Sequence, residues 1–268
     1  MTWLFTKAYR LFPTRMSEPS LARPNAATPG WPAAASSESP VPARYFGVWS
    51  RTLLETPGTC DTDTMVRWMQ LGQWHVDLRV PQSRPGELQG FSGITHVRQV
   101  APNQTELTEI QGVMQKVSRE ICTWQRVVDL QPKGGAADEG WMEFETSQRL
   151  LETGIHSKYF EVWERLPGST GRRIALAEPA RADGKPSARL FVSGDYLMRV
   201  RPAAPRDRTF EISFGKFADG HFCIEASSIP ALAGSRVAMA FVQVDSATAE
   251  VSEGSARGVW TVLEWVET

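Results

Sequence analysis

Acid-base chemistry is suggested by polar side chains that alternate with apolar ones in the segment WHVDLRVP (74–81). His75 and Asp77 project from the same face of the strand that this alternation predicts. Two residues apart on a strand means ~7 Å, which is too far for direct contact, so a partner from another strand, such as Glu161, is needed. His75, Asp77 and Glu161 are therefore the candidate catalytic groups, for a lyase, hydratase or isomerase that needs no cofactor.

A second set of side chains is suited to hold a planar, partly apolar molecule. Trp124 and Trp163 each share a strand face with a charged residue, and we expect the strands 124–131 and 159–165 to lie side by side. Two indoles would then stack on a ligand while a guanidinium holds its carboxylate. The predicted ligand-binding residues are Arg79, Trp124, Arg126, Tyr159 and Trp163. The alternative is that all these residues form solvated strand faces and structural ion pairs.

Motifs of the common enzyme classes are missing from the chain. GxSxG, HExxH, the P-loop and a GxGxxG after a strand are all absent. The 4 His do not cluster with Cys or acidic residues, so a dedicated metal site is not predicted. His156, at the start of a strand, is either a base or haem ligand at a barrel mouth or an exposed loop histidine. The sequence predicts neither a cofactor nor a metal.

Composition limits the partners of the chain. A net charge of -1 with 22% charged residues supplies no field that would attract nucleic acid or an anionic membrane. Aromatic residues are mainly 10 Trp and 12 Phe, with 4 Tyr, and fit a pocket lined by rings. The 3 Cys cannot all pair within the chain, which favours reduced cysteines and a cytoplasmic location. Oligomeric state is left open.

Hydrophobic periodicity predicts strands throughout the chain after residue 44. About a dozen short segments with a period of two are separated by turn signals, which is typical of a barrel or sandwich. One of these predicted strands covers 188–201. The fold class predicted from this pattern is all-β and antiparallel.

The opening segment, Gly47-Val48-Trp49, resembles the Gly-x-Trp strand of the lipocalin/calycin family. In that family the glycine lets the backbone pass close to a neighbour and the tryptophan plugs the barrel floor. The triplet recurs as Gly258-Val259-Trp260, as expected for two barrel-like halves or for first and last strands that close one sheet. The phrases WHVDLRVP, CTWQRVVDLQP and YFEVWERL resemble a calycin-type group that includes the fungal Hri1 proteins. That resemblance implies two lipocalin-like halves, 44–166 and 167–268.

Residues 1–43 differ in composition from the rest. Pro, Ala and Ser dominate 17–43, and such a segment cannot bury enough apolar surface to order itself. We expect residues 1–43 to be a disordered leader that contributes nothing to folding. The aromatic and basic stretch 1–16 is an organellar presequence, a surface-binding stub, or a segment upstream of a true start at Met16. It is too short and too interrupted by charge for a stable membrane span.

Together these features predict a lipocalin-like cytoplasmic protein that binds a small, partly apolar molecule, aromatic or carboxylated, in a barrel. The cofactor-independent enzyme described above is the first alternative. The second alternative is a protein-interaction scaffold whose barrels are filled by side chains. A strand-lined pocket of ~300 Å³ or more distinguishes ligand binding from the scaffold.

Overall fold

The computed structural model describes residues 30–31, 40–83, 88–100, 107–110, 113–116, 120–131, 137–203 and 210–267. Over these residues the chain consists of antiparallel strands and the short 3-10 helices η1 (Ala43–Tyr45) and η4 (Pro230–Leu232). The all-β prediction is confirmed. No helix within the described ranges has the length and apolar character that crossing a membrane requires.

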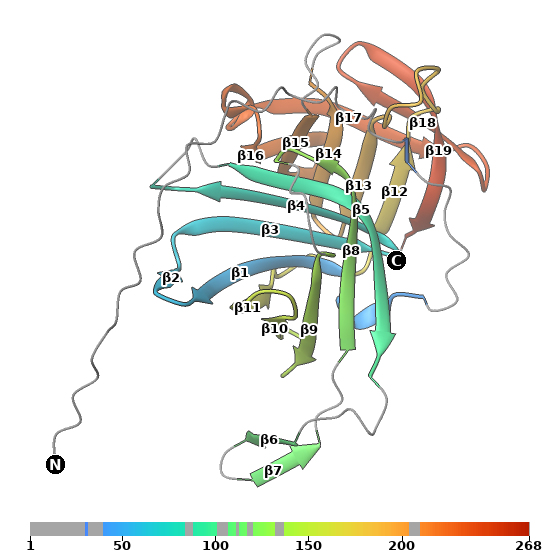
Figure 1. Cartoon of the computed structure of the whole chain (residues 1–268). Coiled ribbons are helices and arrows are strands. Elements are labelled where there is room, and N and C mark those ends of the chain that lie inside the picture. The colour runs from blue at the N-terminus through green and yellow to red at the C-terminus, as the bar shows by residue number, and fades with distance from the viewer. Residues whose placement is uncertain are drawn as a thin grey trace, which may run out of the picture.

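Eight strands close the first barrel (Figure 1). They are β1 (Gly47–Thr56), β3 (Thr64–Leu71), β4 (Trp74–Pro81), β5 (Gln89–Gln99), β8 (Glu120–Asp129), β9 (Glu139–Phe144), β10 (Arg149–Gly154) and β11 (Phe160–Arg165). Closure occurs because β1 pairs with β3 at its start and with β11 along most of its length. Three short strands lie outside this ring: β2 (Thr59–Asp61), β6 (Leu107–Ile110) and β7 (Val113–Lys116). The first of them pairs with the end of β1, and the other two form a hairpin.

Eight further strands close a second barrel, in which β12 pairs with β19. They are β12 (Arg173–Ala177), β13 (Arg189–Ser193), β14 (Tyr196–Pro202), β15 (Phe210–Ala218), β16 (His221–Ser227), β17 (Arg236–Gln243), β18 (Thr248–Glu253) and β19 (Ala256–Val266). The two-barrel interpretation is thus correct, and the single sheet closed by first and last strands is not. The predicted strand 188–201 is wrong in one respect: Gly194, at φ 55°, turns the chain and divides it into β13 and β14.

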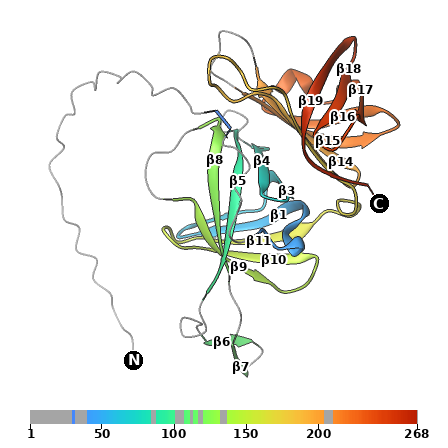
Figure 2. The ribbon, with the colours of Figure 1, turned by 90° about the vertical axis from the view of Figure 1, so that its right-hand side faces the viewer.

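The strand β4 turns its polar face into the first barrel and its apolar face outward. Asp77 and Arg79 point inside, while Trp74, Val76 and Leu78 belong to an apolar cluster outside the barrel wall. This arrangement is stable because the second barrel covers the outer face: the same cluster contains residues of β12, β13, β14, β15 and β16. Figures 1 and 2 show β3 and β4 on the side of the first barrel that faces the second. A continuous apolar core therefore joins the barrels.

Gly47 and Trp49 lie at the closed end of the first barrel. Gly47 has φ 130°, and a Cβ there would come within 3.2 Å of the Ser169 hydroxyl, so the close approach expected of this glycine is present. Trp49 is fully buried against Trp68, and its indole N–H donates to the Tyr45 carbonyl at 2.8 Å. In the second triplet, Trp260 packs against the core of the second barrel but is only partly buried, unlike Trp49.

Two residues of the predicted leader are packed on the barrels. Trp31 contacts Trp74 with ring centroids 6.2 Å apart, and Val41 joins the core of the first barrel. For these two residues the expectation of a leader without contacts is wrong. Residues 1–29 and 32–39 lie outside the described residues.

Candidate functional site

The interior of the first barrel contains a cavity of about 610 Å³, and its lining residue Trp68 stacks on the buried Trp49. This volume lies within the range of small-molecule sites, roughly 300 to 1,000 Å³. Its described lining comprises Leu54, Thr56, Trp68, Asp77, Arg79, Phe91, Trp124, Arg126, Asp129, Ala137, Asp138, Glu152, His156, Ser157, Lys158, Tyr159, Glu161 and Trp163. The second barrel contains an apolar cluster and the ion pairs that Arg199 makes with Glu211 and Glu253.

Seven of the eight residues singled out from the sequence line this one cavity. They are Asp77, Arg79, Trp124, Arg126, Tyr159, Glu161 and Trp163. Their convergence follows from the period of two: every second residue of β4, β8 and β11 points into the barrel. What each of them does there stays a prediction.

His75 is the exception, since it is fully buried and does not line the cavity. Its Nδ1 lies 3.0 Å from the hydroxyl of Thr95, which donates its own proton to Gln70 Oε1 at 2.8 Å. Nδ1 must therefore carry the ring proton. Burial, helped by the charge of Arg126, lowers the pKa of His75 to about 3. The imidazole is neutral at physiological pH and has no contact with Asp77 among the hydrogen bonds described, so the geometry does not support a His75–Asp77 acid-base pair.

Three indoles form the apolar wall of the cavity. Trp68, on β3, lies between Trp124 and Trp163, with ring centroids 5.8 and 5.6 Å away and edge-to-face geometry. The strands that carry Trp124 and Trp163 were predicted to lie side by side. This prediction is wrong, because β9 and β10 separate β8 from β11. Barrel closure brings the two rings onto Trp68 instead. Trp68 was not predicted, although it lies on the same strand face as Val66 and Gln70, at the period of two that the sequence shows.

Both predicted anion-binding guanidiniums already have carboxylate partners. Arg79 Nε donates to Asp77 Oδ1 at 2.8 Å. Arg126 donates to Asp138 through Nε and Nη2, at 2.9 and 2.6 Å, and lies with its Cζ 3.6 Å from the centroid of the Phe91 ring. The donors that would hold a ligand carboxylate are therefore occupied by side chains of the barrel.

Two carboxyl groups face each other across β10 and β11. Glu161 accepts from Arg51 Nη1 at 2.9 Å, whereas Glu152 accepts from the Tyr159 hydroxyl at 2.6 Å and from the Trp163 indole at 3.1 Å. Burial, together with the charge of Glu161, raises the pKa of the Glu152 carboxyl well above its usual range, against the opposing effect of the Tyr159 hydrogen bond. Glu152 was not predicted from the sequence, although it lies on the same buried face of β10 as Leu150.

The cavity has an excess of acidic groups. Its described lining holds five carboxyl side chains, Asp77, Asp129, Asp138, Glu152 and Glu161, and three basic ones, Arg79, Arg126 and Lys158. His156 lies at the mouth, where its Nε2 is 3.0 Å from Glu139 Oε2. Among the residues that the structure describes, no group of three or more His, Cys, Asp or Glu is arranged to hold a metal ion.

Comparison with known proteins extends to the fold. No protein-family model and no curated protein matches the chain. The crystal structure of an uncharacterized protein, YLR301w, from Saccharomyces cerevisiae aligns with a TM-score of 0.53 and 12% identity, over 82% of this chain and 98% of that one. At this identity the likeness supports the two-barrel fold and carries no information about the ligand or the chemistry.

Proposed function

We propose that the first barrel binds a small, partly apolar molecule that contains an aromatic ring. The observation that carries this proposal is the cavity of about 610 Å³ walled by the indoles of Trp68, Trp124 and Trp163. A barrel that served only as a scaffold would gain stability by filling this space with apolar side chains. Aromatic rings of a ligand would meet the indoles edge to face or in offset stacks.

The charges of the cavity favour a neutral or cationic ligand over a carboxylated one. Arg79 and Arg126 are paired with aspartates. Among the other carboxyl groups of the lining, Glu152 has a raised pKa and Glu161 is paired with Arg51, so the lining carries little net charge and its guanidiniums are already neutralised. A ligand carboxylate would have to displace one of these partners and would face the remaining acidic groups. An ammonium group, in contrast, is attracted both by the carboxylates and by the faces of the indoles.

Three ligands that share one skeleton test the proposal: 2-phenylethylamine, 2-phenylethanol and phenylacetate. We expect isothermal titration and tryptophan quenching to rank the amine first and phenylacetate last. Trp163→Ala and Trp124→Ala should each weaken binding of the amine about tenfold, which corresponds to the loss of one aromatic contact of ~1.4 kcal/mol. Trp260→Ala, on β19 of the second barrel, is the matched control and should bind like the parent.

The opposite result would replace the proposal with the interaction-scaffold alternative. That result is no saturable binding of any of the three compounds, or equal binding by the parent and the two cavity variants. A preference for phenylacetate would restore the carboxylated ligand inferred from the sequence and would contradict the charge argument.

A cofactor-independent lyase, hydratase or isomerase is the second candidate, and the pair Glu152 and Glu161 favours it. One carboxyl with a raised pKa beside a second carboxyl that is ion-paired with Arg51 is the arrangement in which a site can both donate and accept a proton. Conversion of a bound ligand, followed by NMR and abolished in Glu152→Gln, would establish this activity. His75 has no place in it, because it does not reach the cavity.

We also infer a cytoplasmic location and a relationship to the Hri1 group. Free cysteines at 60, 122 and 223 support the former, and the two-barrel likeness supports the latter. Fractionation of cells that express the tagged chain tests the location.

A further inference from the structure

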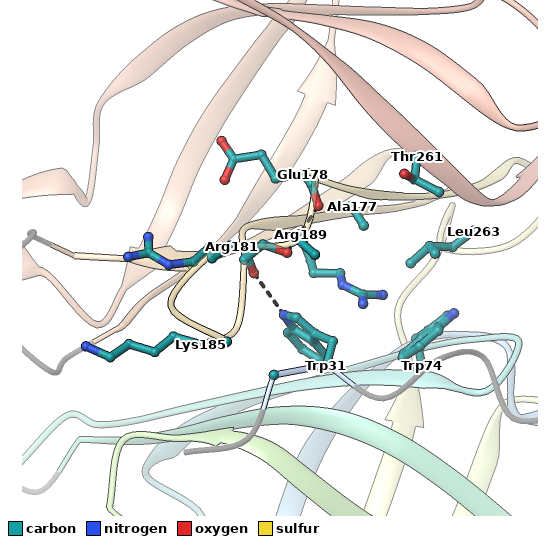
Figure 3. Close-up of a pocket in the computed structure, with 13 residues that line it drawn as sticks. Trp31, Trp74, Ala177, Glu178, Arg181, Lys185, Arg189, Thr261 and Leu263 are labelled. Carbon is teal, nitrogen blue, oxygen red and sulfur yellow. Dashed lines mark hydrogen bonds between the residues drawn. The ribbon is translucent and has the colours of Figure 1, made fainter. Parts of the chain in front are cut away.

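A second hollow, of about 270 Å³, lies between the barrels (Figure 3). We call it the inter-barrel crevice. Trp74 of β4 contributes from the first barrel, and Arg189 of β13 from the second. Trp31, from the N-terminal segment, forms one wall. The other described residues that line the crevice are Gly30, Ala177, Glu178, Ala180, Arg181, Gly184, Lys185, Ser187, Thr261 and Leu263.

Arg189 is a buried cation in this crevice that makes no ion pair with any residue in the described part of the chain. It is 5% exposed, and its Nε and Nη1 are buried with no hydrogen-bond partner among the described residues. Burial lowers its pKa to about 10, which still leaves the guanidinium charged at pH 7. A buried guanidinium with unmade hydrogen bonds is costly unless a partner is supplied.

Two indoles contact this guanidinium without satisfying its donors. Its Cζ lies 4.3 Å from the ring centroid of Trp31 and 4.4 Å from that of Trp74. These cation-π contacts attract the charge but accept none of its N–H bonds. The guanidinium is planar and its N–H bonds lie in its plane, so a carboxylate that reached its edge would supply the missing acceptor.

The N-terminal segment is held in a fixed position at the crevice. Trp31 Nε1 donates to the Ser187 carbonyl at 2.8 Å, as the dashed line in Figure 3 shows. A Cβ on Gly30 would come within 2.8 Å of the Gly184 carbonyl oxygen, which shows how closely the segment approaches the loop before β13. The wall formed by Trp31 is thus part of the packed structure.

We propose that the inter-barrel crevice binds a small organic monocarboxylate, which accepts hydrogen bonds from Arg189 and rests its apolar body against Trp31 and Trp74. A planar carboxylate matches the fork of a guanidinium. Phosphate is less suited, because the neighbouring cations are on the rim: Arg181 is exposed and paired with Asp183, and Lys185 is exposed. This site is separate from the cavity of the first barrel and does not depend on its function.

Benzoate and acetate are the probes, with benzamide as the neutral isostere and inorganic phosphate as the tetrahedral anion. We expect isothermal titration of the full chain to give saturable binding of benzoate, weaker binding of acetate, and no binding of benzamide or phosphate. Arg189→Gln should weaken benzoate binding by about tenfold or more, since a charge-assisted pair is lost. Arg189→Lys keeps the charge without the planar fork and should give an intermediate loss.

Two controls separate this site from its surroundings. Arg149→Gln removes an exposed, ion-paired guanidinium on β10, outside the crevice, and should change benzoate affinity less than about twofold. Trp163→Ala, in the first barrel, should leave benzoate binding unchanged. The proposal is overturned if neither carboxylate binds, if benzamide or phosphate binds as well as benzoate, or if folded Arg189→Gln and Arg189→Lys both bind like the parent.

Discussion

Glu152 and Glu161 lie directly opposite each other on β10 and β11, yet an arginine binds one and not the other. Arg51 donates to Glu161, while Glu152 is bound by a phenol and an indole. Two like charges in a buried cross-strand pair repel, so the pair is stable when Glu152 keeps its proton. The two carboxyls therefore have different partners although their residue types are the same.

The raised pKa of Glu152 predicts a loss of stability as pH increases. Above the ordinary pKa of a glutamate the unfolded chain releases this proton and the folded chain retains it, so unfolding becomes more favourable by about 1.4 kcal/mol per pH unit up to the folded pKa. Glu152→Gln removes this term. In urea unfolding from pH 5 upward, the stability of the variant relative to the parent should increase with pH until the folded pKa of Glu152 is reached. A constant difference between them would mean that Glu152 titrates normally.

The lowered pKa of His75 predicts that stability has the opposite dependence on pH in the acid range. Its folded pKa of about 3 lies below that of a free imidazole, so between about pH 6.5 and 3 the unfolded chain binds a proton that the folded chain does not. Stability should therefore fall as pH falls through this range, by up to about 1.4 kcal/mol per unit. His75→Asn keeps a polar group near Thr95 and should flatten the profile. NMR titration that places the imidazole pKa near 6.5 would contradict the expectation.

Alternation in the sequence was sufficient to find most of the cavity wall, because a period of two places whole sets of residues on one face. It could not say which face is inside. Trp74, Val76 and Leu78 look like the core face of β4, and they are apolar because the second barrel covers them. That partner surface comes from residues more than a hundred positions away, which local patterns do not reveal.

Strand order and ion pairs could not be predicted from the sequence for a similar reason. Trp124 and Trp163 belong to strands separated by β9 and β10, and only closure through β1 brings both rings to Trp68. The partner of Arg126, Asp138, follows a connection with no periodic pattern. A guanidinium therefore looked free in the sequence where the fold pairs it.

Trp49 should be a major contributor to stability. The side chain is fully buried between Trp68, Phe144 and the guanidinium of Arg165, whose Cζ lies 4.5 Å from the indole centroid. Trp49→Ala should reduce the free energy of unfolding by ~3 to 5 kcal/mol through cavity formation. The exposed substitution Val259→Ala is the control, with a change within about 0.5 kcal/mol. A cost below about 1 kcal/mol for Trp49→Ala would remove the argument for a barrel floor at this residue.

Truncations of the N-terminus should have different effects on either side of Trp31. The composition of 1–29 predicts that its deletion leaves the thermal midpoint unchanged. Deletion of 1–43 also removes the contacts of Trp31 with Trp74 and Arg189 and the buried Val41, so the midpoint should fall by several degrees. Trp31→Ala in the full chain should reproduce part of that fall. Equal midpoints for both truncations would show that neither packed residue contributes to stability.

The apolar core between the barrels predicts that they unfold together. Met69, Leu71 and Val76 from the first barrel pack in one buried cluster with Phe191, Phe214 and other residues of the second. Cutting the chain between 166 and 167 would expose this surface on both halves, so we expect each half expressed alone to aggregate and the two coexpressed halves to associate. Calorimetry of the full chain should give one transition whose calorimetric and van't Hoff enthalpies agree. Phe214→Ala should reduce the free energy of unfolding by ~3 to 5 kcal/mol, and the calorimetric trace should still show one transition. Two separate transitions, or two soluble halves that do not associate, would contradict this prediction. Either result would mean that the barrels are independent domains and that the core between them adds little to stability.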